Sequence, residues 1–172
     1  MKEENYLHEV AVTAIVVKDG KFLIEQRSFS KKRFPGRWTV PGGRLHVSDY
    51  ETLPKDTKEY WYNVLEKTLS REVREEVGLE VENVRYLTSL ATVHDGKTPS
   101  LVISCVADYA SGEIRLQAAE TADAKWVSLE EAKQYDLIDG IFDELLMADE
   151  YLKTGRRKIW RRAENPSGGA GS

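Results

Sequence analysis

Three glutamates stand close together in the stretch REVREEVGLE, residues 71–80: Glu72, Glu75 and Glu76. Residues three and four apart share one face of a helix, and like charges at that spacing cost about 0.2–0.5 kcal/mol per pair. The negative end of the helix dipole adds about 0.3–1 kcal/mol for each acid placed there. Either water screens this cluster or a cation belongs beside it, and clustered carboxylate oxygens suit Mg²⁺ or Mn²⁺.

The direction in which these glutamates point follows if residues 57–77 form one helix. At about 100° per residue, an apolar stripe runs along that helix. Its members are Trp61, Tyr62, Leu65, Leu69 and Val73. Glu72 and Glu76 fall inside the arc of this stripe, and Glu75 lies at its edge. Carboxylates that point toward a core need a cation or many hydrogen-bond donors, so the pattern favours a metal site over a solvated face.

The ends of this helix have their own sequence signals. Asp56 followed by Glu59 resembles a capping box, and Pro54 lies just upstream. Gly78 suits a left-handed stop at the C-terminal end. We therefore expect the helix to run from Thr57 to Val77.

The elements around the helix mix strands with helices. The apolar run at residues 8–17 suits a strand covered on both faces, and Asp19-Gly20 predicts a type I′ turn into a returning strand at 21–27. After a basic loop, we expect a short strand at 37–40 that ends at Pro41-Gly42-Gly43. Beyond the long helix, we expect strands at 84–93 and 99–109, joined by a hairpin around 94–97, and a strand at 124–127. The last expected elements are a Ser128-capped helix through 134 and a helix at 139–153. This mixture predicts a single α+β or α/β/α domain.

Composition limits the classes of function. The 172 residues, 41% hydrophobic and 31% charged, suit one ordinary soluble domain. We place this domain at residues 1–163 and expect residues 164–172 to be a disordered tail or a cloning remnant. The net charge of −4 argues against nucleic-acid binding driven by overall charge.

Compartment and redox chemistry follow from two further features. The N-terminal residues form no apolar signal segment and no run reaches transmembrane length, so we expect a cytoplasmic protein with no membrane partner. The single cysteine, Cys105, lies within an apolar run and cannot form an internal disulfide. We expect it to be a small core residue.

The residues from Arg71 to Leu79 carry a family resemblance. The Nudix hydrolases share a box written G-x5-E-x7-R-E-U-x-E-E-x-G-U, where U is a bulky aliphatic residue, and this block matches its second half at every position. The segment Trp38 to Gly43 resembles the strand and glycine loop that open the box, and Glu120 to Trp126 resembles the late loop of the family. The resemblance covers most of residues 8–150. It implies the Nudix fold, an α/β/α sandwich with a mixed parallel and antiparallel sheet.

Two departures from the box concern its first half. Asp49 stands where the box has glutamate, and Glu51 is a second candidate for that role. The 21 residues from Tyr50 to Ser70 stand where the box allows seven. We interpret this as a 14-residue insertion that lengthens the helix at its N-terminal end and adds a loop at Glu51 to Asp56.

The resemblance implies hydrolysis of a nucleoside diphosphate linked to another moiety, with Mg²⁺ or Mn²⁺ as cofactor. By carry-over, Glu72 and Glu76 are metal ligands and the carbonyl of Gly42 completes the site. Glu75 binds a second ion or positions the attacking water. Glu120 is a metal ligand or a general base on a mobile loop, and the alternative that it is an ordinary loop acid is nearly as good.

Several further residues are candidates for substrate binding. Gly43 leaves bare backbone beside a phosphate. Arg27, Arg37 and Arg44 are cations that could bind phosphate, but for each alone a surface position is favoured, least for Arg44 because it adjoins the loop. Arg71 is expected to pair with Glu75 and orient it.

The expected partner is a small-molecule nucleotide, with nucleic acid restricted to an RNA 5′ end. The basic segment at residues 155–162 resembles RNA-binding tails, but a solvated extension is favoured. A homodimer is left open.

Two other functions are compatible with the same fold. A binding or regulatory module of the Nudix fold would hold a nucleotide without turnover, but the intact Arg-Glu block favours an enzyme. A Nudix-type isopentenyl diphosphate isomerase would need a catalytic cysteine in a suitable loop, and Cys105 lies in the middle of an expected strand.

Overall fold

The computed structural model describes residues 6–93 and 98–162. Seven strands form one sheet, with β3, β2, β1, β6 and β5 side by side, β4 paired to β1 and β7 paired to β2. The strands are β1 (Glu9–Lys18), β2 (Lys21–Arg27), β3 (Trp38–Thr39), β4 (Gly42–Arg44), β5 (Leu79–Thr92), β6 (Ser100–Gly112) and β7 (Thr121–Val127). β1 and β6 run parallel, whereas the other pairs are antiparallel. The sheet is therefore mixed, as expected.

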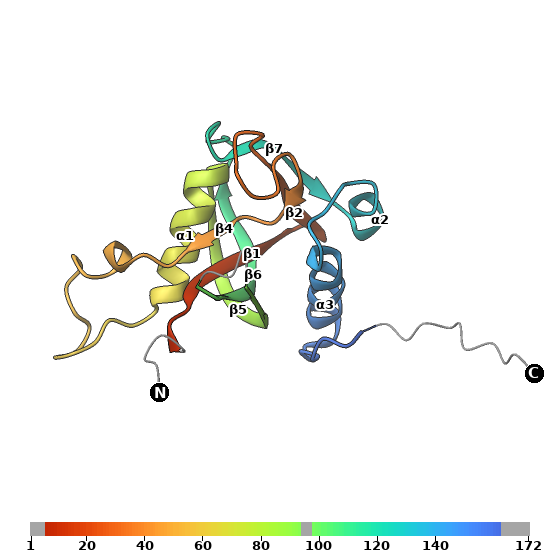
Figure 1. The fold of residues 1–172 in the computed structure, drawn as a ribbon. Coiled ribbons are helices and arrows are strands. Elements are labelled where there is room, and N and C mark those ends of the chain that lie inside the picture. The colour runs from red at the N-terminus through yellow and green to blue at the C-terminus, as the bar shows by residue number, and fades with distance from the viewer. Residues whose placement is uncertain (1–5, 94–97, 163–172) are drawn as a thin grey trace, which may run out of the picture.

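Helices cover both faces of this sheet (Figure 1). They are α1 (Val64–Val77), the short α2 (Leu129–Ala132) and α3 (Ile141–Thr154), with a 3₁₀ turn, η2 (Val47–Asp49), before α1. The layers confirm the α/β/α sandwich. None of the helices in the described ranges is long and apolar enough to cross a membrane.

Alternation along the strands builds two separate cores. On β2, Phe22 and Ile24 face the α3 side with Leu145, whereas Leu23 faces the α1 side with Leu69. The α1-side core also holds Val73, Val77 and the expected core residue Cys105, which is 4% exposed. The α1-side core fixes the helix that carries the glutamates.

Turn and cap chemistry confirms three local predictions. Asp19 and Gly20 have φ of 50° and 73°, the pair of positive values that a type I′ turn requires. Gly78 ends α1 at φ 75°, and its N–H donates to the carbonyl of Arg74 at 3.0 Å. Ser128 caps α2 by accepting a hydrogen bond from the N–H of Glu131. The hairpin expected around residues 94–97 lies outside the described residues.

The predicted start of the long helix is wrong. α1 begins at Val64, not at Thr57, so the inserted residues form a loop and do not lengthen the helix. The Asp56 carboxylate accepts from the N–H of Tyr62 at 2.8 Å, and the Thr57 hydroxyl accepts from the N–H of Tyr60 at 3.1 Å. These side chains satisfy loop backbone in place of a helix end, which is the usual competition between short polar residues and helix.

The loop at residues 50–63 projects beside α1 (Figure 1). Residues 51–60 are all exposed. Tyr62 is 55% exposed, so its expected place in the buried stripe is also wrong. Trp61 is partly buried instead, where its indole N–H donates to the Leu53 carbonyl at 2.9 Å and its ring packs on Tyr50. The insertion has local order of its own.

The remaining boundaries shift modestly. β5 begins at Leu79, directly after the helix stop, where the sequence predicted a strand only from residue 84. β6 and β7 each extend beyond their expected ranges, and α2 is shorter than expected. One further difference does concern site residues, since Gly42 and Gly43 of the expected glycine loop belong to strand β4.

Candidate active site

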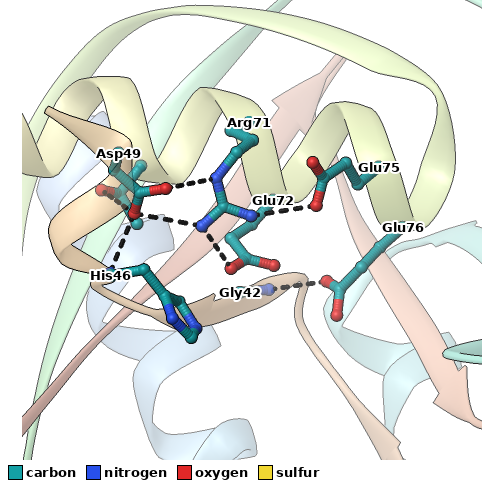
Figure 2. A network of polar contacts seen from close by, with 8 residues as sticks. Gly42, His46, Asp49, Arg71, Glu72, Glu75 and Glu76 are labelled. Carbon is teal, nitrogen blue, oxygen red and sulfur yellow. Dashed lines mark hydrogen bonds and ion pairs between the residues drawn. The ribbon is translucent and has the colours of Figure 1, made fainter. Parts of the chain in front are cut away.

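The C-terminal half of α1 lies against the glycine loop (Figure 2). β4 pairs antiparallel with β1, with Thr13 opposite Gly42 and Val12 opposite Gly43. This pairing fixes the loop beneath the helix, and the N–H of Gly42 donates to Oε2 of Glu76 at 2.9 Å. This bond from a backbone N–H to a carboxylate joins Gly42 and Glu76, which are far apart in the sequence.

Both glycines of the loop are required by space. A Cβ on Gly43 would lie 2.2 Å from the carboxylate carbon of Glu72, and a Cβ on Gly42 would lie 2.4 Å from the Val12 carbonyl oxygen. Any side chain at position 43 would therefore displace the Glu72 carboxylate. The absence of a side chain at Gly42 lets β4 lie close to the backbone of β1, and its absence at Gly43 leaves space for the Glu72 carboxylate.

Arg71 holds three carboxylates at once (Figure 2). Its Nε donates to Oδ1 of Asp49 at 2.8 Å, its Nη2 to Oε1 of Glu72 at 2.9 Å and its Nη1 to Oε2 of Glu75 at 2.9 Å. The expected Arg71–Glu75 pair is present, and the pairing with Asp49 extends it. A planar guanidinium with five donors suits this task.

Asp49, not Glu51, takes the place of the box glutamate. Besides Arg71, its carboxylate accepts from the Thr68 hydroxyl and from the His46 N–H, each at 3.0 Å. Burial raises the pKa of Asp49, but these donors, Arg71 above all, outweigh it and hold the pKa below its usual value. Glu51 is exposed. Asp49 is therefore the acid that contacts Arg71 of the Arg-Glu block.

Glu76 is the most deeply buried of the three glutamates in the α1 cluster, at 8% exposure. Burial raises its pKa to about 7, with the Gly42 N–H opposing and the charge of Glu72 adding to the rise. Burial likewise raises the pKa of Glu72, and Arg71 offsets part of the rise. An ionised pair here is costly without added positive charge.

Glu25 on β2 is a buried acid next to Glu76 to which the sequence analysis assigned no role. It is 3% exposed, and burial together with the neighbouring Glu76 charge raises its pKa well above the usual value. The Thr121 hydroxyl donates to its Oε2 at 3.3 Å. A signal existed, because Glu25 follows Leu23 on the inward face of a strand that is otherwise apolar at its centre.

A cleft of about 580 Å³ brings the candidate residues together. Eight of the site residues expected from the sequence line it: Arg27, Gly42, Gly43, Arg44, Glu72, Glu75, Glu76 and Glu120. Arg37 is not among the lining residues, because it turns to Asp136 and the Leu137 carbonyl. Arg44 is largely exposed and pairs with Glu9 at 3.2 Å.

The cleft also contains residues to which the sequence assigned no role. Lys31, Arg33 and Phe34 come from the loop between β2 and β3, and His46 and Gln117 come from two other loops. That first loop was identified only as basic. The signal was its density of cations, but which of them enter the cleft depends on the loop conformation.

Carboxylate oxygens on the α1 face of the cleft are the groups that could bind a divalent cation. Within the described part of the chain, no three His, Cys, Asp or Glu side chains form a ready metal arrangement. Protein donors hold each candidate carboxylate. The donor set nevertheless fits, because Glu72 and Glu76 are oxygen ligands with burial-raised pKa values beside bare glycine backbone. A hard cation there would favour their ionised forms.

Residues 7–146 match the model of the NUDIX domain, and the chain belongs to this family. The resemblance in the box is thereby confirmed. An NAD-capped RNA hydrolase NudC from Erwinia tasmaniensis is 42% identical over 125 residues, which cover 72% of this chain and 40% of that protein. A NudC from Mannheimia succiniciproducens is 47% identical over 66 residues, 38% of this chain and 24% of that protein. The chain thus matches less than half of each of these relatives.

Solved structures support the same fold. The crystal structure of a NUDIX hydrolase from Alicyclobacillus acidocaldarius aligns with a TM-score of 0.69 at 16% identity, covering 90% of this chain and 99% of that one. At that identity the likeness concerns the fold alone. It agrees with the mixed sheet between two helical layers.

Proposed function

We propose that the chain is a pyrophosphohydrolase that uses Mg²⁺ or Mn²⁺ to cleave the diphosphate bridge of a nucleoside diphosphate linked to another moiety. The observation that carries this proposal is one cleft lined by both acidic and cationic side chains. Glu72, Glu75 and Glu76 line the cleft from α1, and Arg27, Lys31 and Arg33 line it from the end of β2 and the loop that follows. A diphosphate with its divalent cation has charges of both signs to match.

The acidic residues divide the work according to their contacts. Glu72 and Glu76, beside Gly42, would hold the ion, which supplies Lewis-acid polarisation and lowers the pKa of a bound water. Arg71, fixed by Asp49, keeps Glu72 and Glu75 in place before substrate arrives. Preorganisation of this kind lowers the barrier because the groups need not reorient during reaction.

The two remaining acids are the candidates for handling the attacking water. Glu75 is half exposed and lines the cleft, so it can bind a second ion or orient the water. Glu120 lies immediately before β7, lines the same cleft and is the candidate general base. Each of these two acids forms an ion pair with a protein side chain, and that pair would have to break before the acid could bind an ion or the water.

Substrate binding falls to the cations and the glycine loop. Arg27 is held by the hydrogen bond from its Nε to the Arg33 carbonyl at 3.0 Å, and Arg44 lies at the mouth of the cleft. Both line the cleft, which supports a role in binding phosphate oxygens, and Gly43 carries no side chain that would fill the space beside Glu72. Because relatives are named NAD-capped RNA hydrolases, a dinucleotide joined through a diphosphate is the first substrate to test.

The isomerase alternative has no support in the site. Cys105 lies in the middle of β6, is 4% exposed, and does not line the cleft. Burial raises the pKa of its thiol to about 11, so the reactive thiolate is scarce near neutral pH.

The test is a panel of NAD, ADP-ribose, nucleoside triphosphates, dinucleoside polyphosphates and NAD-capped RNA, with Mg²⁺ or Mn²⁺. Nucleoside monophosphate and phosphate are both detected, and Glu76→Gln serves as the inactive control. Turnover of a diphosphate-linked nucleotide by the wild type alone is the expected result. Tight nucleotide binding without any turnover would instead assign the chain to the binding modules.

A further inference from the structure

Lys31 and Glu120 form an ion pair at the cleft. Lys31 belongs to the loop between β2 and β3, whereas Glu120 directly precedes β7. Both side chains line the cleft, with 27% and 36% exposure. The pair therefore places a cation and an acid of the cleft side by side, on two segments that adjoin each other.

Backbone hydrogen bonds hold these two segments together. The N–H of Ser28 donates to the Glu120 carbonyl at 2.9 Å, and the N–H of Lys31 donates to the Ser28 carbonyl at 3.1 Å. The register of β2 against β7 continues into this contact, with Arg27 opposite Thr121. The side-chain pair thus sits on a fixed backbone frame, and only the two side chains need to move to separate it.

Lys31 differs from Arg71, the other cation that holds acids of this cleft. Arg71 makes contacts with three carboxylates and is anchored by Asp49. Lys31 has Glu120 as its side-chain partner among the described residues, and a lysine carries one flexible point charge. A single, partly exposed pair of this kind is weak, so an incoming phosphate can compete for the ammonium.

We propose that Lys31 is an exchangeable counter-ion: it neutralises Glu120 while the cleft has no substrate and transfers to the diphosphate when a nucleotide enters. The transfer releases Glu120 for the divalent cation or the attacking water. This inference rests on the proposed function. It explains why an acid and a cation, each with a task during reaction, pair in the ligand-free protein.

The exchange predicts effects of opposite sign when Lys31 is removed. In Lys31→Met, Glu120 has no cation to displace, so Mn²⁺ alone should bind more tightly. The same variant lacks a phosphate contact, so a diphosphate should bind more weakly. If the ion pair had only a structural role, Lys31→Met would not strengthen Mn²⁺ binding while it weakens diphosphate binding. Loss of the pair would then loosen the loop and lower the affinity for both ligands, or leave both affinities unchanged.

The experiment is isothermal calorimetry on the wild type, Lys31→Met and the matched control Lys32→Met, whose lysine is exposed and does not line the cleft. The probes are Mn²⁺ alone and, at saturating Mg²⁺, α,β-methylene ADP, whose bridging carbon resists hydrolysis. For Lys31→Met we expect Mn²⁺ affinity to rise about threefold and affinity for the ADP analogue to fall about tenfold. Lys32→Met should match the wild type.

A second variant keeps the test decisive if Lys31→Met does not fold. Glu120→Gln frees Lys31, so α,β-methylene ADP without metal should bind about threefold tighter than to the wild type. Wild-type binding of both probes with neither variant shifted in its expected direction would overturn the exchange and leave the proposed function standing. No binding of either probe by the wild type would overturn both.

Discussion

Two buried glutamates on opposite faces of the sheet make an informative pair. Glu76 on α1 is 8% exposed and Glu144 on α3 is 7% exposed, and burial raises the pKa of both. The Ser104 hydroxyl donates to Glu144 at 2.5 Å, inside the core. Glu76 receives the Gly42 N–H, but it also faces the carboxyls of Glu72 and Glu25 and opens to the cleft.

The two glutamates differ in the groups that offset the cost of burying their carboxyl groups. Glu144 has a neutral donor from within the fold, so its burial is a finished structural arrangement. Glu76 has the negative neighbours Glu72 and Glu25, and Arg27 and Lys31 oppose the rise of its pKa only in part. We expect a divalent cation to complete its environment. Burial alone therefore does not identify a functional acid, whereas burial among like charges beside a cleft does.

The largest expected difference between Glu76 and Glu144 is the effect of their substitution by Gln on turnover. Glu76→Gln keeps the side-chain volume but removes a metal-ligand charge, so activity on a substrate found in the panel should fall at least about a hundredfold. Metal-free stability should stay the same or rise by up to about 1 kcal/mol, because repulsion at the helix end is relieved. Glu144→Gln should keep turnover within about threefold. Near-normal rates for Glu76→Gln would sink the metal-site assignment.

The second expected difference between Glu76 and Glu144 is in the pH dependence of the free energy of unfolding. The pKa of Glu76 in the folded protein, about 7, lies above the ordinary 4.5, so the folded state holds this proton more tightly. Its stabilising contribution is complete below pH 4.5 and is lost as the pH rises through 7, by up to about 3 kcal/mol. Saturating Mg²⁺ should remove this loss, because the ion favours the ionised carboxylate.

Urea unfolding at pH 5 and pH 8, with EDTA and with Mg²⁺, measures this effect. The Glu76→Gln variant should show a smaller fall from pH 5 to pH 8 in EDTA than the wild type. The part of the fall that Glu144 contributes should persist in Mg²⁺, since Glu144 lies on α3 and does not line the cleft. A metal-free wild type that becomes more stable between these pH values would contradict the assignment.

The support of the acidic cluster can be tested through Asp49. In Asp49→Asn, Arg71 loses its charged anchor, so Glu72 and Glu75 are held less firmly and turnover should fall about tenfold or more. Glu51→Gln is the matched control, because Glu51 is exposed and should leave turnover unchanged. Equal losses in both variants would mean that Asp49 does not have the positioning role.

Local patterns accounted for the parts of the site that the sequence predicted. The block from Arg71 to Gly78 sits on one helix, so spacing alone places Glu72 and Glu76 on its inward face. The Gly42-Gly43 loop came from family resemblance, and the structure adds the reason, since Glu72 fills the space above Gly43. The roles of the site residues, the cytoplasmic location and a homodimer stay predictions.

The misses share a dependence on contacts between distant segments. Lys31 reaches Glu120 only because β2 pairs with β7, and Glu25 meets Glu76 only once α1 packs on the sheet. The helix start failed for a different reason. Asp56 looked like a helix cap, but it caps the loop backbone at Tyr62, and a sequence pattern does not distinguish these two uses.

Ser104→Ala should give the smallest effect and completes the comparison on the α3 side. The variant removes the donor to Glu144 at a fully buried position, so the free energy of unfolding should fall by about 1 kcal/mol. Mg²⁺ should not restore it, and turnover should stay near normal, because Ser104 faces away from the cleft. Denaturant unfolding with and without Mg²⁺ makes the measurement, with Ser89→Ala as an exposed control. If Mg²⁺ did rescue Ser104→Ala, Glu144 would also be a cation-dependent acid, and the distinction between the two faces of the sheet would fail.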